Sequence, residues 1–177
     1  MSDKVRLATV WLDGCSGCHM SMLDIDERLL DIADKIELVH SPLCDVKEFP
    51  ENVDLVLIEG AVTNEEDLHK ALKARNNSKL VLALGDCAVT SNVPGMRNYF
   101  EIDDVYDRAF VENATIDQQV PKVAVPALLE RTRPLHEVIK VDIYVPGCPP
   151  SADTIFAAIS ELLEGRVPDT GAISGFG

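Results

Sequence analysis

The chain has 177 residues, 46% of them hydrophobic, and its 30 acidic and 16 basic residues give a formal net charge of −14. This length suits one domain with a sizeable core rather than two. A surface with this much negative charge repels phosphate groups, so nucleic acids and anionic membrane surfaces are poor candidate partners. No stretch approaches the roughly 20 apolar residues of a membrane span, and no export signal is visible, so we expect no membrane insertion and a cytoplasmic location.

Strands and helices are expected to alternate along the chain. Short apolar and β-branched runs predict strands at residues 5–11, 36–40, 54–59, 79–84 and 141–145. Apolar residues at helical spacing, with caps at Asn64 and Ser151, predict helices at residues 20–33, 64–74 and 151–163. The periodicity fades between residues 98 and 133, which predicts an extended excursion with at most short elements. Residues 166–177 are expected to form a tail.

This alternation predicts a single α/β domain over residues 1–177, built on a flavodoxin-like, doubly wound parallel sheet. Neither G-x-G-x-x-G after the first strand nor G-x-x-x-x-G-K-[ST] anywhere is present. Bound FMN would suit the fold, but no visible phosphate-binding motif supports it.

Four of the five cysteines follow strands that should end at one edge of this sheet. Cys15 and Cys18 form a C-x-x-C after the first strand, Cys87 follows the strand at 79–84, and Cys148 follows the last strand. The carboxyl ends of parallel strands share one edge, so we expect the four thiols to converge there. Thiols in a reducing compartment favour metal or redox chemistry over structural disulfides.

Four thiolates suit either a structural zinc ion or an iron–sulfur cluster. Structural zinc usually uses two C-x-x-C pairs, and this chain has one. Glycines beside the cysteines would leave room for a bulky group: Gly14, Gly17, Gly85 and Gly147. A cluster is therefore favoured over zinc. A thioredoxin-like disulfide is less favoured still, because it leaves Cys87 and Cys148 unexplained.

Other polar residues and the fifth cysteine fall near the same strand ends. Glu59 could relay protons or bond near an interface, or its carboxylate could simply be satisfied by a helix N-terminus. Asp86 is expected to fix its loop by accepting backbone N–H groups. His19 could donate to a cluster sulfur, or face an interface or the surface. We interpret Cys44 as a small buried apolar residue.

Four sequence blocks together resemble a known family. They read DGCSGCHMSMLD (13–24), EGAV (59–62), ALGDCAVTSNVPGMRN (83–98) and VDIYVPGCPPSAD (141–153). They are similar to the small-subunit family of nickel–iron hydrogenases, which includes the twenty-kilodalton subunit of NADH–quinone oxidoreductases. The resemblance covers about residues 5–165 and is strongest to the small subunit of soluble, bidirectional NAD-reducing hydrogenases.

The resemblance implies that Cys15, Cys18, Cys87 and Cys148 ligate one [4Fe-4S] cluster, proximal to a nickel–iron centre in a separate large subunit. Electrons would pass between that centre and an iron–sulfur and flavin diaphorase module that reacts with NAD(H). The chain would then belong to a hydrogen:NAD⁺ oxidoreductase without being active alone. Cys44 is the one thiol left over, and a nickel–iron site takes four thiolates in the family.

Two alternatives stay open within the family. The chain could serve a deazaflavin- or heterodisulfide-linked hydrogenase, or it could be an electron carrier of the quinone-oxidoreductase type. Quinone-reducing members carry tandem cysteines in the first motif. Here Ser16-Gly17 separates Cys15 from Cys18, which favours the hydrogenase side.

Overall fold

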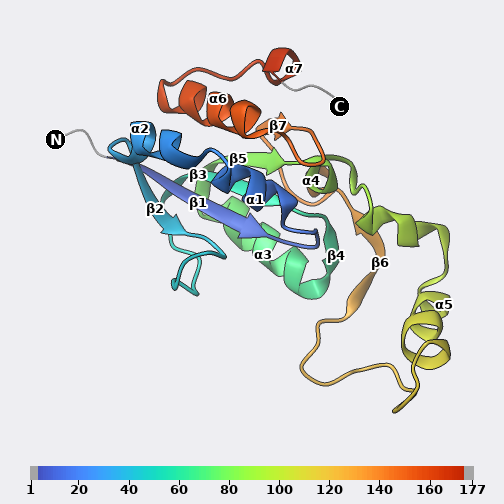
Figure 1. The fold of residues 1–177 in the computed structure, drawn as a ribbon. Coiled ribbons are helices and arrows are strands. Elements are labelled where there is room, and N and C mark those ends of the chain that lie inside the picture. Colours follow the sequence, from blue (N-terminus) through green and yellow to red (C-terminus); the bar gives the residue numbers. More distant parts are fainter. Residues whose placement is uncertain (1–3, 174–177) are drawn as a thin grey trace.

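A parallel sheet forms the centre of the computed structural model, which describes residues 4–173 (Figure 1). Its five strands lie in the order β2-β1-β3-β5-β7, and every neighbouring pair is parallel. Counted along the chain, this is the 2-1-3-4-5 order of flavodoxin-like sheets, so the predicted fold class is confirmed. The strands are β1 (Val5–Trp11), β2 (Ile36–His40), β3 (Val53–Glu59), β5 (Ser78–Leu84) and β7 (Ile143–Val145).

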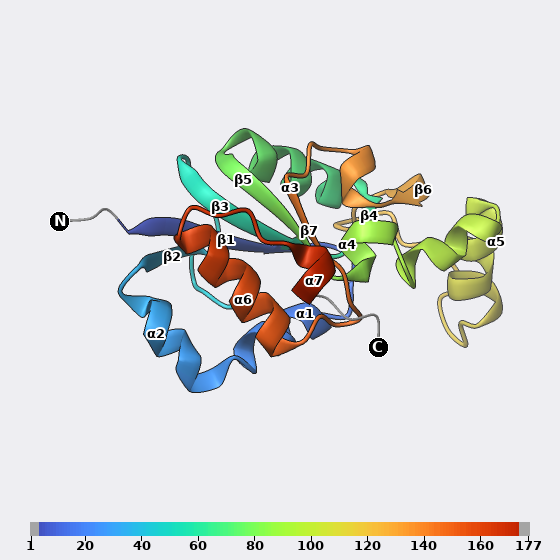
Figure 2. The same ribbon diagram turned by 90° about the horizontal axis from the view of Figure 1, so that it is seen from above.

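Helices cover both faces of the sheet (Figure 2). The helices α1, α2 and α6 pack on one face over a core that includes Leu57, Leu82 and Ile155. On the other face α3 and α4 pack over a second core that includes Val56 and Ala71. The bounds are α1 (Gly17–Leu23), α2 (Leu29–Ala33), α3 (Glu65–Asn76), α4 (Asp86–Thr90), α6 (Ala152–Leu163) and α7 (Thr170–Ile173).

The two predicted helix caps are confirmed. The Asn64 side chain accepts a hydrogen bond from the Asp67 N–H at 2.9 Å, and the Ser151 hydroxyl accepts one from the Thr154 N–H at 3.2 Å. Each bond satisfies an N–H that the first turn of a helix leaves without a partner.

The helix expected at 20–33 is instead two helices. The first, α1, begins at Gly17 and ends at Leu23, and a 3₁₀ turn, η1 (Asp26–Arg28), precedes α2. The break lies at Asp26, whose φ of +58° is left-handed and cannot continue a right-handed helix. No glycine or proline marks this position, so the sequence pattern missed it. The expected tail contains α7, and its last four residues, 174–177, lie outside the described part.

The excursion holds short elements, as predicted, and also a strand pair that the sequence did not reveal. Strand β4 (Val62–Asn64) pairs antiparallel with β6 (Leu128–Arg133). Residues 99–127, which lead directly into β6, extend away from the sheet, and we call this segment the arm (Figure 1). Its short helical elements are α5 (Ile102–Tyr106) and the π-helical η3 (Asp107–Glu112); η2 (Pro94–Tyr99) leads into the excursion, and η4 (Leu135–Glu137) follows it.

Side chains tie the base of the arm to the ribbon formed by β4 and β6. Arg97 donates to the carbonyls of Thr63 at 3.0 Å and Leu129 at 2.8 Å. Asn98 both donates to and accepts from the backbone of Thr132, each at 2.8 Å. Within residues 4–173, no helix has the length and apolar character needed to cross a membrane.

Candidate functional site

The four predicted thiols lie at the carboxyl ends of the sheet strands. The parallel strands point the same way, and α1, α4 and the loop after β7 begin at that edge (Figure 1). Cys15 follows β1, Cys18 lies in the first turn of α1, Cys87 lies in α4 after β5, and Cys148 follows β7. All four are free thiols.

These thiols are close enough to act on one another electrostatically. Burial is the main cause that raises the pKa of Cys18 well above its ordinary value, followed by the charge of Glu59 and the other three thiols. Burial, followed by Cys148 and Cys15, raises the pKa of Cys87 to about 11. Positive charge is needed to hold such thiols as thiolates, so metal binding here must displace protons.

Among the described residues, no three His, Cys, Asp or Glu side chains are grouped so that they could hold a single metal ion. The chemistry of the donor set suits an iron–sulfur cluster, because four free thiols follow strand ends at this one edge.

Gly85 is required by the packing around the sulfur of Cys18. A Cβ at Gly85 would lie 2.2 Å from Cys18 Sγ, and its φ of +81° is left-handed. A Cβ at Gly17 would lie 3.2 Å from Cys15 Sγ. At these two positions the absence of a side chain thus makes room for a cysteine sulfur, and room for a bulky bound group stays a prediction. At Gly14 and Gly147 the atoms nearest a Cβ are backbone atoms instead.

Glu59 fixes the start of α1 from the end of β3. Its carboxylate accepts hydrogen bonds from the Cys18 N–H at 3.3 Å and the His19 N–H at 2.9 Å, and the residue is only 2% exposed. Of the two interpretations offered for Glu59, satisfaction by a helix N-terminus is thus confirmed.

His19 is buried, so the expectation of a surface or interface position is wrong. Its Nδ1 is bonded to the carboxylate of Glu59 and its Nε2 lies 3.0 Å from the Thr9 hydroxyl. Neither ring nitrogen is left to donate to a cluster sulfur. His19 instead holds the carboxylate that positions the backbone of Cys18. The sequence could not show this, because β1 and β3 must pair before Thr9 and Glu59 meet His19.

Asp86 fixes its loop as predicted. Its carboxylate accepts from the Gly147 N–H at 2.7 Å, while its own N–H donates to the Gly147 carbonyl at 2.9 Å. This pair of bonds joins the loop that carries Cys87 to the loop that carries Cys148. On the other side, the Ser21 hydroxyl of α1 donates to the Pro150 carbonyl at 2.6 Å.

One residue at the site escaped the sequence prediction. The side-chain amide of Asn92 donates to Cys148 Sγ at 3.3 Å. Asn92 lies in SNVPG, whose asparagine, proline and glycine are typical of a turn. These residue types do not indicate that the turn contacts a thiol 56 positions later in the chain.

Cys44 stands apart from the other four. It follows β2, the outermost strand of the sheet, and is half-buried rather than fully buried as expected. It lines a hollow of about 400 Å³ together with His40, His69 and other residues. Its charge is not among the causes that raise the pKa of Cys18 or of Cys87.

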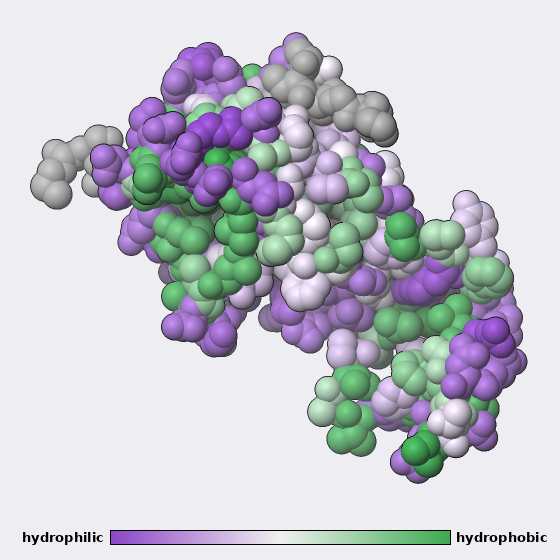
Figure 3. Space-filling view, viewed as in Figure 1, coloured by the Kyte–Doolittle hydropathy of each residue, from purple (hydrophilic) through white to green (hydrophobic). Residues whose placement is uncertain are grey.

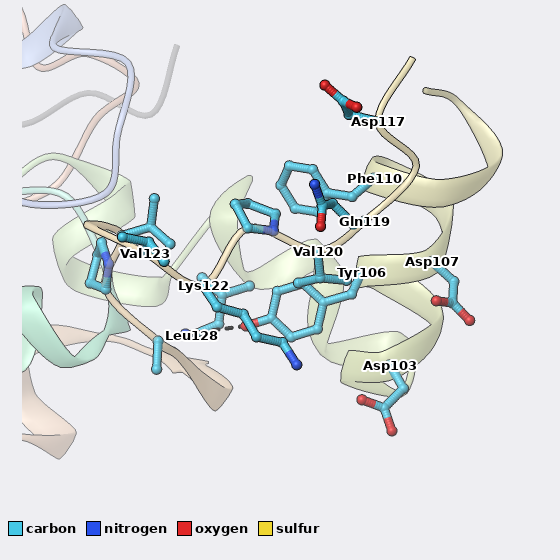
Figure 4. A pocket seen from close by; sticks show the side chains of 14 residues that line it. Asp103, Tyr106, Asp107, Phe110, Asp117, Gln119, Val120, Lys122, Val123 and Leu128 are labelled. Carbon is cyan, nitrogen blue, oxygen red and sulfur yellow. Dashed lines mark hydrogen bonds between the residues drawn. The ribbon is translucent and has the colours of Figure 1, made fainter. Parts of the chain in front are cut away.

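A large cavity lies in the arm and away from the thiols. Its volume is about 1410 Å³, and it is lined by arm residues together with Leu128 of β6 (Figure 4). Tyr106 forms part of the cavity wall, and its hydroxyl accepts a hydrogen bond from the Leu128 N–H at 3.3 Å. None of the described residues that line this cavity is a thiol or a histidine, so the thiol edge is the candidate site for redox chemistry.

The family with the description "NADH ubiquinone oxidoreductase, 20 Kd subunit" matches residues 15–162, a range that includes all four of these thiols. The chain belongs to this family. The chain is 39% identical to the delta subunit of the NAD-reducing hydrogenase HoxS of Cupriavidus necator. The alignment covers 92% of this chain and 80% of that subunit.

Archaeal relatives of this family member are longer. It is 41% identical to a subunit of the F420-non-reducing hydrogenase of Methanothermobacter marburgensis, over 94% of this chain but 56% of that subunit. The chain therefore spans a little over half the length of this archaeal relative. The sequence-based assignment to the hydrogenase small-subunit family is confirmed, and these homologues are hydrogenase subunits within an oxidoreductase family.

Solved structures agree with the fold of this family member. A chain of an NAD⁺-reducing [NiFe]-hydrogenase in the H₂-reduced state matches it with a TM-score of 0.89 and 39% identity, over 94% of each chain. A chain of the [NiFeSe]-hydrogenase of Desulfomicrobium baculatum matches with a TM-score of 0.60 and 18% identity, over 94% of this chain and 67% of that one, and supports the fold alone.

Proposed function

We propose that this chain is the electron-transferring small subunit of a cytoplasmic nickel–iron hydrogenase. In this proposal Cys15, Cys18, Cys87 and Cys148 hold one [4Fe-4S] cluster, which accepts and releases single electrons when bound. The observation that carries the proposal is the convergence of four free thiols, from three separate strand ends, on one sheet edge.

The surroundings of the thiols support a cluster over a single zinc ion. Structural zinc sites usually use two C-x-x-C pairs, whereas this chain has one pair, Cys15 and Cys18, and two separate cysteines. The raised pKa values of Cys18 and Cys87 mean that positive charge must be bound beside them before they become thiolates. Iron in a cluster provides that charge.

The protein around the thiols holds them in fixed positions. Glu59, itself held by His19, orients the backbone of Cys18, and Asp86 joins the loops of Cys87 and Cys148. Ligands fixed in this way need little rearrangement when an electron arrives, because their partners are already bonded.

Exposed apolar residues beside the site support partner subunits. Trp11 and Met20 are each 45% exposed, although they flank the strand end and helix that carry Cys15 and Cys18. Exposed large apolar side chains near one another are typical of interaction surfaces. An interface there would shield the cluster from water and bring it near the next redox centre.

The arm provides a second surface of this kind. Figure 3 shows apolar residues exposed on it, and Ile116 and Val123 are 79% and 87% exposed. The open cavity shown in Figure 4 is lined by Tyr106, Phe110 and Val120 and also by two carboxylates, Asp103 and Asp107. The arm has six acidic and two basic residues, so we expect its partner surface to combine apolar and basic side chains.

The partners are proposed from the relatives. The HoxS delta subunit belongs to an NAD-reducing hydrogenase, and this chain spans 80% of that subunit. We therefore propose a nickel–iron large subunit on one side of the electron path and an iron–sulfur and flavin diaphorase module that reacts with NAD(H) on the other. Electrons from hydrogen would pass through this subunit, and reverse flow would produce hydrogen.

The test compares two cysteine variants of the anaerobically purified full chain. Cys148→Ser should lose or weaken the cluster, whereas Cys44→Ser should keep about four irons per chain and the brown colour of the wild type. Equal iron content in both variants would overturn the assignment. A colourless wild-type chain with one zinc would support a structural zinc site instead. Copurification with a nickel–iron large subunit and a diaphorase pair tests the proposed partners.

A further inference from the structure

The turn after α4 has an unusual backbone. Ser91 and Asn92 are consecutive non-glycine residues with positive φ angles of 68° and 30°. Residues other than glycine rarely adopt this region, and asparagine is one of the few that tolerate it. Two such residues in a row indicate that the surrounding structure holds the turn in place.

The contacts of the turn explain how it is held. The Gly95 N–H donates to the carbonyls of Ser91 at 3.0 Å and Asn92 at 3.2 Å. Beyond it, η2 is fixed to β6 and β4 through Arg97 and Asn98. The turn is therefore clamped between α4, which carries Cys87, and the base of the arm.

This clamped turn directs one polar group at the thiol site. The Asn92 amide lies 3.3 Å from Cys148 Sγ, although the two residues come from different loops. A thiolate that ligates iron carries no proton, so it can only accept a hydrogen bond. The amide must then present its NH₂ group, which is the orientation in the structure.

We propose that Asn92 is a positioning residue that raises the reduction potential of the cluster through an N–H···S bond to Cys148. The inference rests on the proposed function, because it requires the cluster. Reduction adds one electron and increases the negative charge on the sulfurs. A donor bonds more strongly to the more negative sulfur, so it stabilises the reduced state more than the oxidised one.

The variants Asn92→Gly and Asn92→Asp separate the effect of the hydrogen-bond donor from the effect of the backbone conformation. Glycine adopts the positive φ without strain but has no side chain, so it removes only the donor. Aspartate tolerates the same backbone and replaces the donor with a negative charge. Asn113→Gly, at an exposed position of the arm, is the matched control.

The experiment reconstitutes the full chain under anaerobic conditions and titrates its cluster by EPR against redox mediators. We expect Asn92→Gly to keep its iron and to shift the reduction equilibrium by about tenfold toward the oxidised state, which is ~59 mV for one electron. Asn92→Asp should shift it further in the same direction, and Asn113→Gly should not shift it. Wild-type potentials in both Asn92 variants would overturn the inference.

The outcomes also distinguish this inference from the proposed function. A wild-type chain that binds no iron contradicts the proposed function itself. If the wild type binds iron but the Asn92 variants do not, pulsed EPR on wild-type protein labelled with ¹⁵N-asparagine decides the question. A ¹⁵N coupling to the reduced cluster supports the bond, and the absence of any coupling overturns it.

Discussion

Replacing Gly85 with alanine should damage the thiol site through one contact. The added Cβ would lie 2.2 Å from Cys18 Sγ, so the sulfur must move by more than about 1 Å to reach ordinary contact. Cys18 is buried and has little room for such a shift. Metal–ligand distances tolerate deviations of only about 0.2 Å, so the displaced sulfur should fail to ligate.

The expected loss of stability has two parts. An alanine held at positive φ costs about 1–2 kcal/mol. Forcing extra atoms into a packed site costs a further amount of about 1–3 kcal/mol. Gly165→Ala separates the two parts, because Gly165 also has a positive φ, of +74°, but no atom lies within 4 Å of its added Cβ. That variant should lose only the backbone part.

Urea unfolding of the metal-free chains measures the two free energies, and iron analysis after anaerobic reconstitution measures the site. Gly85→Ala should unfold at lower urea than Gly165→Ala and should bind far less iron. Wild-type iron content in Gly85→Ala would refute the reasoning, since it would mean that the sulfur of Cys18 is free to move or does not ligate.

Three further predictions concern the rest of the chain. Burial alone would raise the pKa of Asp142, but bonds from the Val81 N–H and from Arg75 and a nearby lysine lower it overall. Its carboxylate therefore stabilises the fold above about pH 4 and stops doing so as the pH falls through its lowered pKa. Asp142→Asn should cost about 2 kcal/mol at neutral pH and less in strong acid, as measured by urea unfolding across pH; a constant difference would contradict this. Asn64→Ala should lower the unfolding free energy by about 1 kcal/mol, because α3 loses its cap, and an unchanged urea midpoint would contradict the cap. Val123→Glu on the arm should leave the isolated chain stable but weaken its copurification with partner subunits, whereas Leu30→Glu, at another exposed apolar position, should not; equal recovery of partners would exclude the arm from the interface.

The central strands β3 and β5 were predictable from the sequence because most of their side chains are buried. Runs such as DLVLIE and KLVLAL are apolar almost throughout, which is typical of central parallel strands. Strand β4 has only three residues and pairs with β6, more than 60 positions later, so its pattern is too short to stand out. The break at Asp26 was missed because an aspartate in the left-handed region leaves no mark in the apolar spacing.

The sequence predicted only those features of the site that depend on where the strands end. The loops after parallel strands all begin at one edge of the sheet, so the convergence of the cysteines could be argued from topology. Burial of His19 depends on Thr9 and Glu59, and the bond of Asn92 depends on how the turn after α4 is clamped. Such contacts are set by tertiary packing, and local sequence does not encode them.

The bonds at the base of the arm have a consequence for how this chain can vary. Arg97 and Asn98, just before the arm, are bonded directly to β6, just after it. The arm is thus a loop whose two ends are fastened together outside the sheet. Doubling the length of a flexible loop costs only about 0.6 kcal/mol of closure entropy. The arm can therefore be lengthened, shortened or exchanged during evolution to suit a new partner, while the sheet edge with its thiols stays unchanged.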